Sequence, residues 1–177
     1  AGILDHMKQV WGAPASLDQT SVLPVVGTKE LVASLPSQLG LGPDSTIVIP
    51  ACAYPTYRVG ARLAGARVVA VDEPDEVDVA PDLIWINSPA NPSGRVLNLD
   101  QMKAWVDLAR STEAVLVSDE CYGEFVWEGE SVSVLDKRVN GGDVTGLLAC
   151  LSMSKRSNMA GYRAGFVVGD AELTSEL

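Results

Sequence analysis

The chain has 177 residues, and 13 Lys and Arg against 23 Asp and Glu give it a formal net charge of −10. Apolar residues make up 47% and charged residues 20%, which is ordinary for a globular protein of one domain and excludes a disordered chain. No apolar run reaches the roughly 20 residues that a membrane helix requires, and the first ten residues lack a signal-peptide pattern. The excess of acid would repel a phosphate backbone, so we expect neither a membrane nor a nucleic-acid partner.

Cysteine usage indicates the compartment. The three cysteines, Cys52, Cys121 and Cys150, are odd in number, lie far apart and lack metal-ligand spacing. Such usage is typical of buried thiols in a reducing compartment. We therefore expect a cytoplasmic protein with buried, unpaired cysteines.

Short apolar runs alternate along the chain with amphipathic segments. Each run is rich in Val, Ile or Leu and nearly continuous, as in strands of a parallel sheet that helices cover on both faces. The predicted strands occupy residues 22–26, 46–50, 66–71, 83–87, 115–118, 147–151 and 164–168, and the predicted helices 3–11, 28–39, 56–63 and 99–109. Asn98 and Gln101 form a capping box at the start of the last helix. The sequence therefore predicts an α/β unit of about seven strands.

An acidic segment follows the third predicted strand. Residues 72–82 hold six acids and two prolines, which could form a cation site. Nothing spaces these acids as metal ligands, so the pattern favours a solvated connecting loop.

Ligands of parallel sheets bind beyond the carboxyl ends of the strands, so the residues that follow each strand are candidates for function. Gly27, Thr28 and Lys29 follow the first strand and begin a helix, which is typical of an anion site or of an ordinary turn. Tyr54 could stack on a flat ligand or pack against its own helix. Asn91 lies in a loop stiffened by prolines, where its amide is either a rigid donor or part of a structural turn.

Charged side chains follow the later strands. Asp119 ends a buried strand, which requires either a structural salt bridge or a cationic ligand atom. A single lysine such as Lys155 is usually a solvated surface charge. Here the hydroxyls of Ser152 and Ser154 and the guanidinium of Arg163 would form an anion site next to its amine.

The position of Arg163 has a geometric consequence. Arg163 precedes its strand, whereas the other candidates follow theirs. For Arg163 to reach the same edge of the sheet, the strand at 164–168 must run antiparallel to the others.

The order and spacing of these motifs resemble the fold-type I, pyridoxal-phosphate-dependent class I and II aminotransferases over nearly the whole chain. The motifs are Gly27-Thr28-Lys29, Tyr54-Pro55-Thr56-Tyr57, Asn91-Pro92-Ser93-Gly94, Asp119-Glu120-Cys121-Tyr122, and Ser152-Met153-Ser154-Lys155 with Arg163 eight residues later. The resemblance implies a seven-stranded, mostly parallel sheet with one antiparallel strand and helices on both faces, as in the large domain of this family.

The resemblance also implies a role for each residue. Lys155 would form a Schiff base with the cofactor aldehyde and later act as the general base, and Asp119 would pair with the pyridine nitrogen. Tyr122 and Asn91 would bond the phenolic oxygen, and Tyr54 would stack on the ring. The residues expected around the phosphate are Gly27, Thr28, Lys29, Ser152 and Arg163, with Ser154 beside them.

Within the family, residues 53–57 and 154–163 most resemble actinobacterial-type N-succinyldiaminopimelate aminotransferases. This implies transamination of N-succinyl-LL-2,6-diaminopimelate with 2-oxoglutarate, in lysine biosynthesis. Other class I and II aminotransferases and a pyridoxal-phosphate-dependent C–S lyase share the same residues. A non-catalytic, aminotransferase-like effector domain is a further alternative, although nothing here is basic enough for the DNA-binding part of such a regulator. The simplest alternative is an α/β domain that binds no cofactor.

Members of the family are about twice as long as this chain. Residues 1–177 correspond to the large cofactor-binding domain, whereas the N-terminal arm and the C-terminal small domain lie outside it. The small domain carries the arginine that grips the substrate carboxylate, and no candidate for it is present. The resemblance further implies a homodimer.

Overall fold

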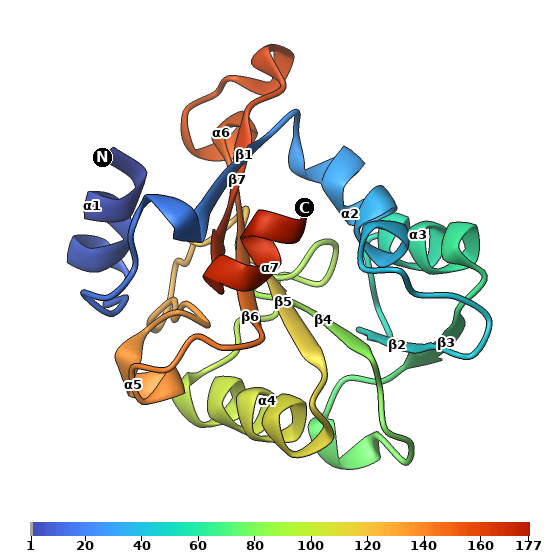
Figure 1. The fold of residues 1–177 in the computed structure, drawn as a ribbon. Helices are drawn as coiled ribbons and strands as arrows, with labels where there is room; N and C mark the ends of the chain where they lie inside the picture. Colours follow the sequence, from blue (N-terminus) through green and yellow to red (C-terminus); the bar gives the residue numbers. More distant parts are fainter. Residues whose placement is uncertain (1) are drawn as a thin grey trace.

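The computed structural model describes residues 2–177, which form a central sheet between two layers of helices (Figure 1). The sheet has seven strands in the order β1-β7-β6-β5-β4-β2-β3. The strands are β1 Val22–Val25, β2 Thr46–Ile49, β3 Arg67–Ala70, β4 Leu83–Asn87, β5 Val115–Asp119, β6 Leu147–Ser152 and β7 Gly165–Gly169.

One strand runs against the rest. The pairs among β2 to β6 are parallel, whereas β7 is antiparallel to both of its neighbours, β6 and β1. The predicted α/β class, the seven strands and the reversed direction of the last one are confirmed. The carboxyl ends of β1, β4, β5 and β6 therefore lie at the edge of the sheet where β7 begins.

Helices cover both faces of the sheet. The helices α1, α4 and α5 contribute to one buried cluster, and α2 and α3 to the other, against which Leu173 of α7 also packs. The α-helices are α1 Gly2–Val10, α2 Thr28–Gln38, α3 Thr56–Ala64, α4 Leu99–Thr112, α5 Lys137–Asn140, α6 Met153–Arg156 and α7 Ala171–Glu176. Short 3-10 turns lie at Gln19–Ser21, Pro74–Glu76 and Ala160–Tyr162.

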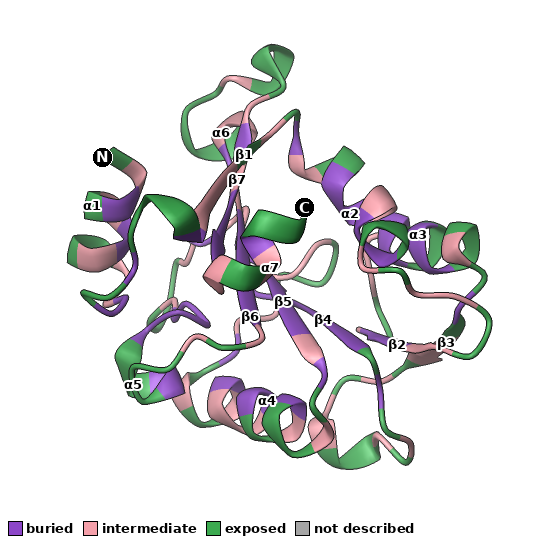
Figure 2. Cartoon of the chain, in the orientation of Figure 1, coloured by how far each residue is buried: buried purple, intermediate pink, exposed green. Residues whose placement is uncertain are grey.

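Burial follows the position of each strand in the sheet. Every residue of the interior strand β4 is buried (Figure 2). Ile84 and Ile86 belong to one cluster, and Leu83 and Trp85 belong to the other. The two edge strands, β1 and β3, are only partly covered. The prediction of strands buried on both faces is therefore wrong for these two, because each has a neighbour on one side only.

The observed strand ends differ from the predicted ones in ways that affect the site. Val26 is 74% exposed and lies outside β1. In contrast, β5 continues to Asp119, which pairs with Cys150, and β6 continues to Ser152, which pairs with Gly165. These two polar residues are thus held in the hydrogen-bonded ladder, where the backbone cannot shift.

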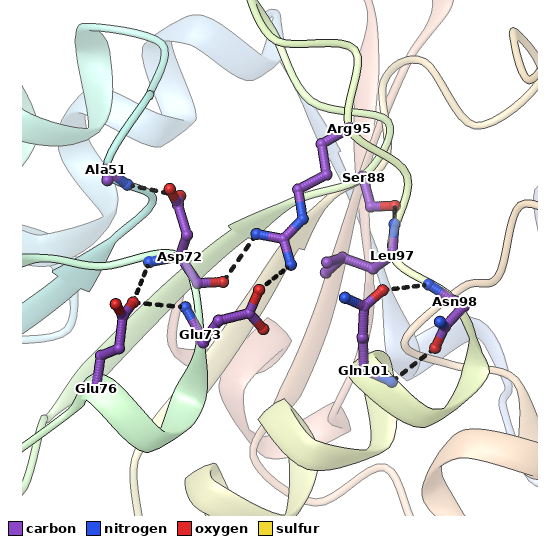
Figure 3. A network of polar contacts seen from close by, with 9 residues as sticks. All are labelled: Ala51, Asp72, Glu73, Glu76, Ser88, Arg95, Leu97, Asn98 and Gln101. Carbon is purple, nitrogen blue, oxygen red and sulfur yellow. Dashed lines mark hydrogen bonds and ion pairs between the residues drawn. The ribbon is translucent and has the colours of Figure 1, made fainter.

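The helix α4 begins with the predicted capping box. The Asn98 side chain accepts from the Gln101 backbone, and the Gln101 side chain accepts from the Asn98 backbone (Figure 3). The helix continues three residues beyond the predicted end at 109, because its C-cap Glu113 adopts the left-handed conformation that closes it.

The acidic segment forms a connecting loop, as predicted. Glu73 pairs with Arg95, and the Asp72 side chain accepts from the Ala51 backbone (Figure 3). Between residues 2 and 177, no group of acids, histidines and cysteines is placed to hold a metal ion.

Two further expectations concern the surroundings of the protein. Across residues 2–177, no helix combines the length and the hydropathy needed to cross a membrane. All three cysteines are free, and Cys150 is buried, but Cys121 is half-buried and Cys52 is exposed. The expectation of buried thiols is therefore wrong for Cys52, because the loop after β2 lies at the surface.

The capping box of α4 gives a test of the fold. Asn98→Ala removes the acceptor for an orphan backbone N–H, so the free energy of unfolding should fall by about 1 kcal/mol. Asn98→Asp keeps an acceptor and is the matched control, with urea unfolding as the measurement. Equal stability of wild type and Asn98→Ala would contradict this role for the cap.

Candidate active site

One cavity, of about 280 Å³, collects nearly all of the residues that the sequence predicts for function. It lies at the sheet edge where the carboxyl ends of β4, β5 and β6 meet the start of α2. Of the predicted site residues, those that line it are Thr28, Lys29, Tyr54, Asn91, Asp119, Tyr122, Ser152, Lys155 and Arg163, with Ser154 beside them. The structure therefore brings together side chains separated by up to 135 positions in the sequence, Thr28 and Arg163 being the outermost.

Gly27 does not line the cavity but lies directly beneath Arg163. Its φ of +84° is in the left-handed region, and a Cβ atom at this position would lie 2.3 Å from Nη2 of Arg163. The Arg163 guanidinium also donates to Oε2 of Glu30 at 2.7 Å and to the carbonyl of Ala160 at 3.2 Å. The positive φ therefore favours glycine here, whereas the nearby side-chain ends of Arg163 and Glu30 could shift to make room for a Cβ atom.

The start of α2 provides an anion site. The first backbone N–H groups of any helix have no intrahelical partner. Gly27, the N-cap of α2, makes no side-chain capping bond to them, so they can donate to a ligand. Thr28 and Lys29 begin the helix and line the cavity together with Arg163. Lys29, Arg163 and a helix N-terminus therefore face the same space, although Arg163 also forms an ion pair with Glu30. This arrangement favours an anionic ligand group.

Lys155 lies on the short helix α6, directly after β6. The backbone N–H of Met153 donates to the carbonyl of Ala164 at 3.1 Å, so the chain doubles back toward β7 and brings Arg163 to the same edge. The amine Nζ of Lys155 lies 5.8 Å from the centre of the Tyr122 ring. The amine and a phenol are thus neighbours in the cavity.

Asp119 is a carboxylate that ends a strand and is only 8% exposed. Its Oδ2 accepts from the hydroxyl of Tyr57 at 2.7 Å, and its Oδ1 accepts from the backbone of Cys121 at 3.2 Å. No ion pair formed within residues 2–177 includes Asp119. A structural salt bridge to Asp119 is therefore absent within residues 2–177, and the carboxylate can pair with a cationic ligand atom in the cavity.

Asn87 has a structural role that the sequence analysis missed. Its Nδ2 donates to the carbonyls of Asp119 at 2.8 Å and of Pro89 at 3.2 Å, and its Oδ1 accepts from the backbone of Asn91 at 2.7 Å. Asn87 thereby ties the loop that carries Asn91 to the end of β5. A polar residue at the last position of an otherwise apolar strand was the available signal.

Tyr57 is the second residue that the sequence analysis missed. The residue is fully buried, and its hydroxyl donates to Asp119. Burial, followed by the charge of Asp119, raises the pKa of Tyr57 well above its ordinary value, so the hydroxyl stays protonated. The sequence placed Tyr57 in a helix and in a motif, but it could not show that the side chain reaches a strand 62 positions away.

Glu120 is buried next to the site, but its side chain does not line the cavity. Its Oε1 accepts from the backbone of Val134 at 2.8 Å, which ties the segment before α5 to the end of β5. Burial raises the pKa of Glu120 to about 7. This carboxyl group is thus protonated in mildly acidic solution, in contrast to an exposed glutamate.

Glu120 makes the stability of the fold depend on pH. Because its pKa is about 7 in the folded chain and 4.5 ordinarily, the folded state binds more protons between these values. Its contribution to stability is complete below pH 4.5 and is lost as the pH rises toward 7. Wild type should lose about 2 kcal/mol from this group between pH 5 and pH 8, whereas Glu120→Gln should not.

The measurement for Glu120 is urea unfolding at both pH values. Glu128 is exposed on the following loop, so Glu128→Gln is the matched control and should behave as wild type. An equal pH dependence of wild type and Glu120→Gln would contradict this origin of the loss.

Comparison with known proteins identifies the family. Residues 7–177 match the family described as Aminotransferase class I and II. The chain belongs to the class I and II aminotransferases. The chain is also 54% identical over 162 residues to a probable aminotransferase of Mycobacterium tuberculosis, with 91% of this chain and 39% of that protein covered.

One further sequence relative and one solved structure are also named as aminotransferases or transaminases. The chain is 52% identical over 163 residues to the 4-dedimethylamino-4-oxo-anhydrotetracycline transaminase OxyQ of Streptomyces rimosus, covering 92% of this chain and 45% of that protein. A probable N-succinyldiaminopimelate aminotransferase of Thermus thermophilus superposes with a TM-score of 0.88 at 27% identity, covering 97% of this chain and 48% of the other. The chain thus spans less than half the length of these relatives.

Class I and II aminotransferases depend on pyridoxal phosphate, and the cavity suits this cofactor. The cofactor is an aromatic aldehyde with a phosphate and a ring nitrogen that can be protonated. Lys29, Arg163 and the start of α2 suit the phosphate. The carboxylate of Asp119 forms no ion pair within residues 2–177, so it suits the protonated ring nitrogen. Lys155 supplies the amine, and Tyr54 supplies an aromatic face.

Proposed function

We propose that the protein is a pyridoxal-phosphate-dependent aminotransferase, which exchanges an amino group between an amino acid and a 2-oxo acid. The observation that carries this proposal is the convergence of Lys155, Asp119 and Arg163 on one cavity. An amine, a carboxylate and an anion site are the three groups that the cofactor requires. Relatives named as aminotransferases favour transamination over elimination by a C–S lyase or a non-catalytic role.

Lys155 would hold the cofactor and move a proton. Its amine would attach the cofactor and, when free, would act as the general base at the substrate Cα. When bound, the cofactor supplies an electron sink for the pair released from the Cα–H bond. The negative charge of Asp119 would maintain this sink because it favours a protonated ring nitrogen.

The other residues of the cavity would hold the cofactor in place. Tyr122 and Asn91 would donate to its phenolic oxygen, and Tyr54 would offer its ring an aromatic face. Arg163, Ser152, Thr28 and Lys29 would hold the phosphate, and Gly27, which lies outside the lining, would contribute through the turn that begins α2. Segments from distant parts of the chain therefore contribute to one site, and a preformed site reduces the entropy lost on binding.

Covalent attachment tests the site residue by residue. Pyridoxal phosphate added to wild type should be trapped by borohydride on the peptide that contains Lys155, and Lys155→Ala should trap none. Lys137 is an exposed lysine at the start of α5, so Lys137→Ala is the control and should be labelled as wild type. Labelling that persists in Lys155→Ala would contradict the assignment.

The charge of Asp119 can be removed without changing the shape of the side chain. Asp119→Asn should slow the transfer of an amino group to bound cofactor by about a thousandfold or more, because a neutral amide does not favour a protonated ring nitrogen. Single-turnover absorbance of the cofactor-loaded complete protein measures this rate. A loss of less than about tenfold would contradict the role of the charge.

We propose N-succinyl-LL-2,6-diaminopimelate and 2-oxoglutarate as the substrate pair, in lysine biosynthesis. Support comes from the Thermus thermophilus neighbour and from the resemblance of residues 53–57 and 154–163. The 52% identity to a tetracycline-pathway transaminase favours a second candidate, a bulky cyclic ketone as amino acceptor. Glutamate formation from N-succinyl-diaminopimelate in the complete protein, compared with amination of such a ketone, distinguishes the two.

The same proposal includes a homodimer and a cytoplasmic location. The family resemblance supports the dimer, since sites of this family are completed across two subunits. The three free cysteines support a reducing compartment. Sedimentation of the complete protein tests the dimer, and a monomeric mass would contradict it.

A further inference from the structure

We propose that Tyr57 is a positioning residue of this site, which fixes the Asp119 carboxylate and the Tyr54 ring relative to each other. The inference rests on the proposed function, because it concerns two groups that would contact the cofactor. Tyr57 itself does not line the cavity. It therefore acts through its neighbours rather than on the cofactor.

The hydrogen bond of Tyr57 fixes the orientation of the Asp119 carboxylate. Oδ2 accepts from the Tyr57 hydroxyl at 2.7 Å, and Oδ1 accepts from the Cys121 backbone at 3.2 Å. Each oxygen thus has one protein donor, so rotation of the carboxylate would break both bonds. The remaining acceptor sites of the two oxygens are left for the cavity that Asp119 lines.

The ring of Tyr57 is held as firmly as its hydroxyl. It is fully buried and packs against Trp85, with ring centres 5.1 Å apart and an angle of 31° between the rings. Its helix α3 lies against α2 through Gly60, where a Cβ atom would come within 2.6 Å of the Val32 carbonyl. The close contact between these helices leaves Tyr57 no room to shift.

Tyr57 also contacts the predicted stacking residue. The rings of Tyr54 and Tyr57 meet edge to face, with centres 6.1 Å apart and an angle of 83°. An edge-to-face arrangement is one of the favourable arrangements for two aromatic rings. One buried side chain therefore supports both the stacking face and the carboxylate of the site.

The chemistry of a tyrosine suits this position. A neutral hydroxyl that remains protonated stabilises the Asp119 anion but leaves its full negative charge for a ring nitrogen. A lysine or arginine in its place would neutralise Asp119 and compete with the cofactor. Tyr57 thus orients the carboxylate without satisfying its charge.

Tyr57→Phe tests this role, because it removes the hydroxyl and keeps the ring. The matched control is Tyr162→Phe, the same change at a side chain that is 76% exposed. In the complete protein, Tyr57→Phe should weaken binding of pyridoxal phosphate about tenfold, as expected for the loss of a hydrogen bond to a charged group. Tyr162→Phe should bind as wild type.

A spectroscopic measurement separates positioning from a purely structural role. Without the donor, the Asp119 anion is less stable and the ring nitrogen holds its proton less firmly. A ring nitrogen without its proton withdraws fewer electrons, so the nitrogen that joins the cofactor to Lys155 should become more basic. The absorbance that reports protonation of this second nitrogen should then change with pH at a midpoint about one unit higher. The melting temperature of the cofactor-free protein is measured alongside.

The outcomes distinguish the inference from the proposed function. Unchanged affinity and midpoint in Tyr57→Phe would overturn the positioning role, as would a lower melting temperature with the same affinity and midpoint. If wild type itself bound no pyridoxal phosphate, the proposed function would fail first. A shift confined to Tyr57→Phe, with Tyr162→Phe equal to wild type, supports the role.

Discussion

The buried carboxylate of Asp119 is the constraint on which the site depends. A negative charge at the end of a central strand is costly, and the protein reduces this cost with two neutral hydrogen bonds rather than with a cation from residues 2–177. The charge therefore remains available to the cavity. In the proposed function, a cationic ring atom of the cofactor is the partner of this charge.

The topology of the sheet gives Asp119 its neighbours. Asn87, Asp119 and Ser152 each end a parallel strand, so they lie at the same edge of the sheet. Arg163 precedes β7, and because β7 is antiparallel its first residue lies at that edge as well. Lys155 follows directly after β6, on the short helix α6, and lines the same cavity as Asp119 and Ser152. A parallel β7 would have carried Arg163 to the far edge, away from the start of α2.

Much of this arrangement could be predicted from the sequence because its signals are local. The capping box at Asn98 and the apolar run of β4 depend on neighbouring residues, and both are observed. The direction of β7 followed from a single requirement, namely that Arg163 share a site with Lys155. Family resemblance supplied the chemical roles, which spacing alone could not give.

The features that escaped prediction depend on contacts between distant parts of the chain. The bond from Tyr57 to Asp119 and those from Asn87 to the loop of Asn91 exist only once the strands are assembled. Exposure of Cys52 depends on the course of the loop after β2, and exposure of the edge strands depends on which strands lie at the ends of the sheet. No periodicity in the sequence records that order.

A crystal structure of the complete protein with bound pyridoxal phosphate tests the central claim most directly. The account predicts a ring nitrogen within hydrogen-bond distance of Asp119, a covalent bond from the cofactor to Lys155, and a phosphate against Arg163. A cofactor bound elsewhere, or Asp119 paired with a cation of the protein, would contradict it.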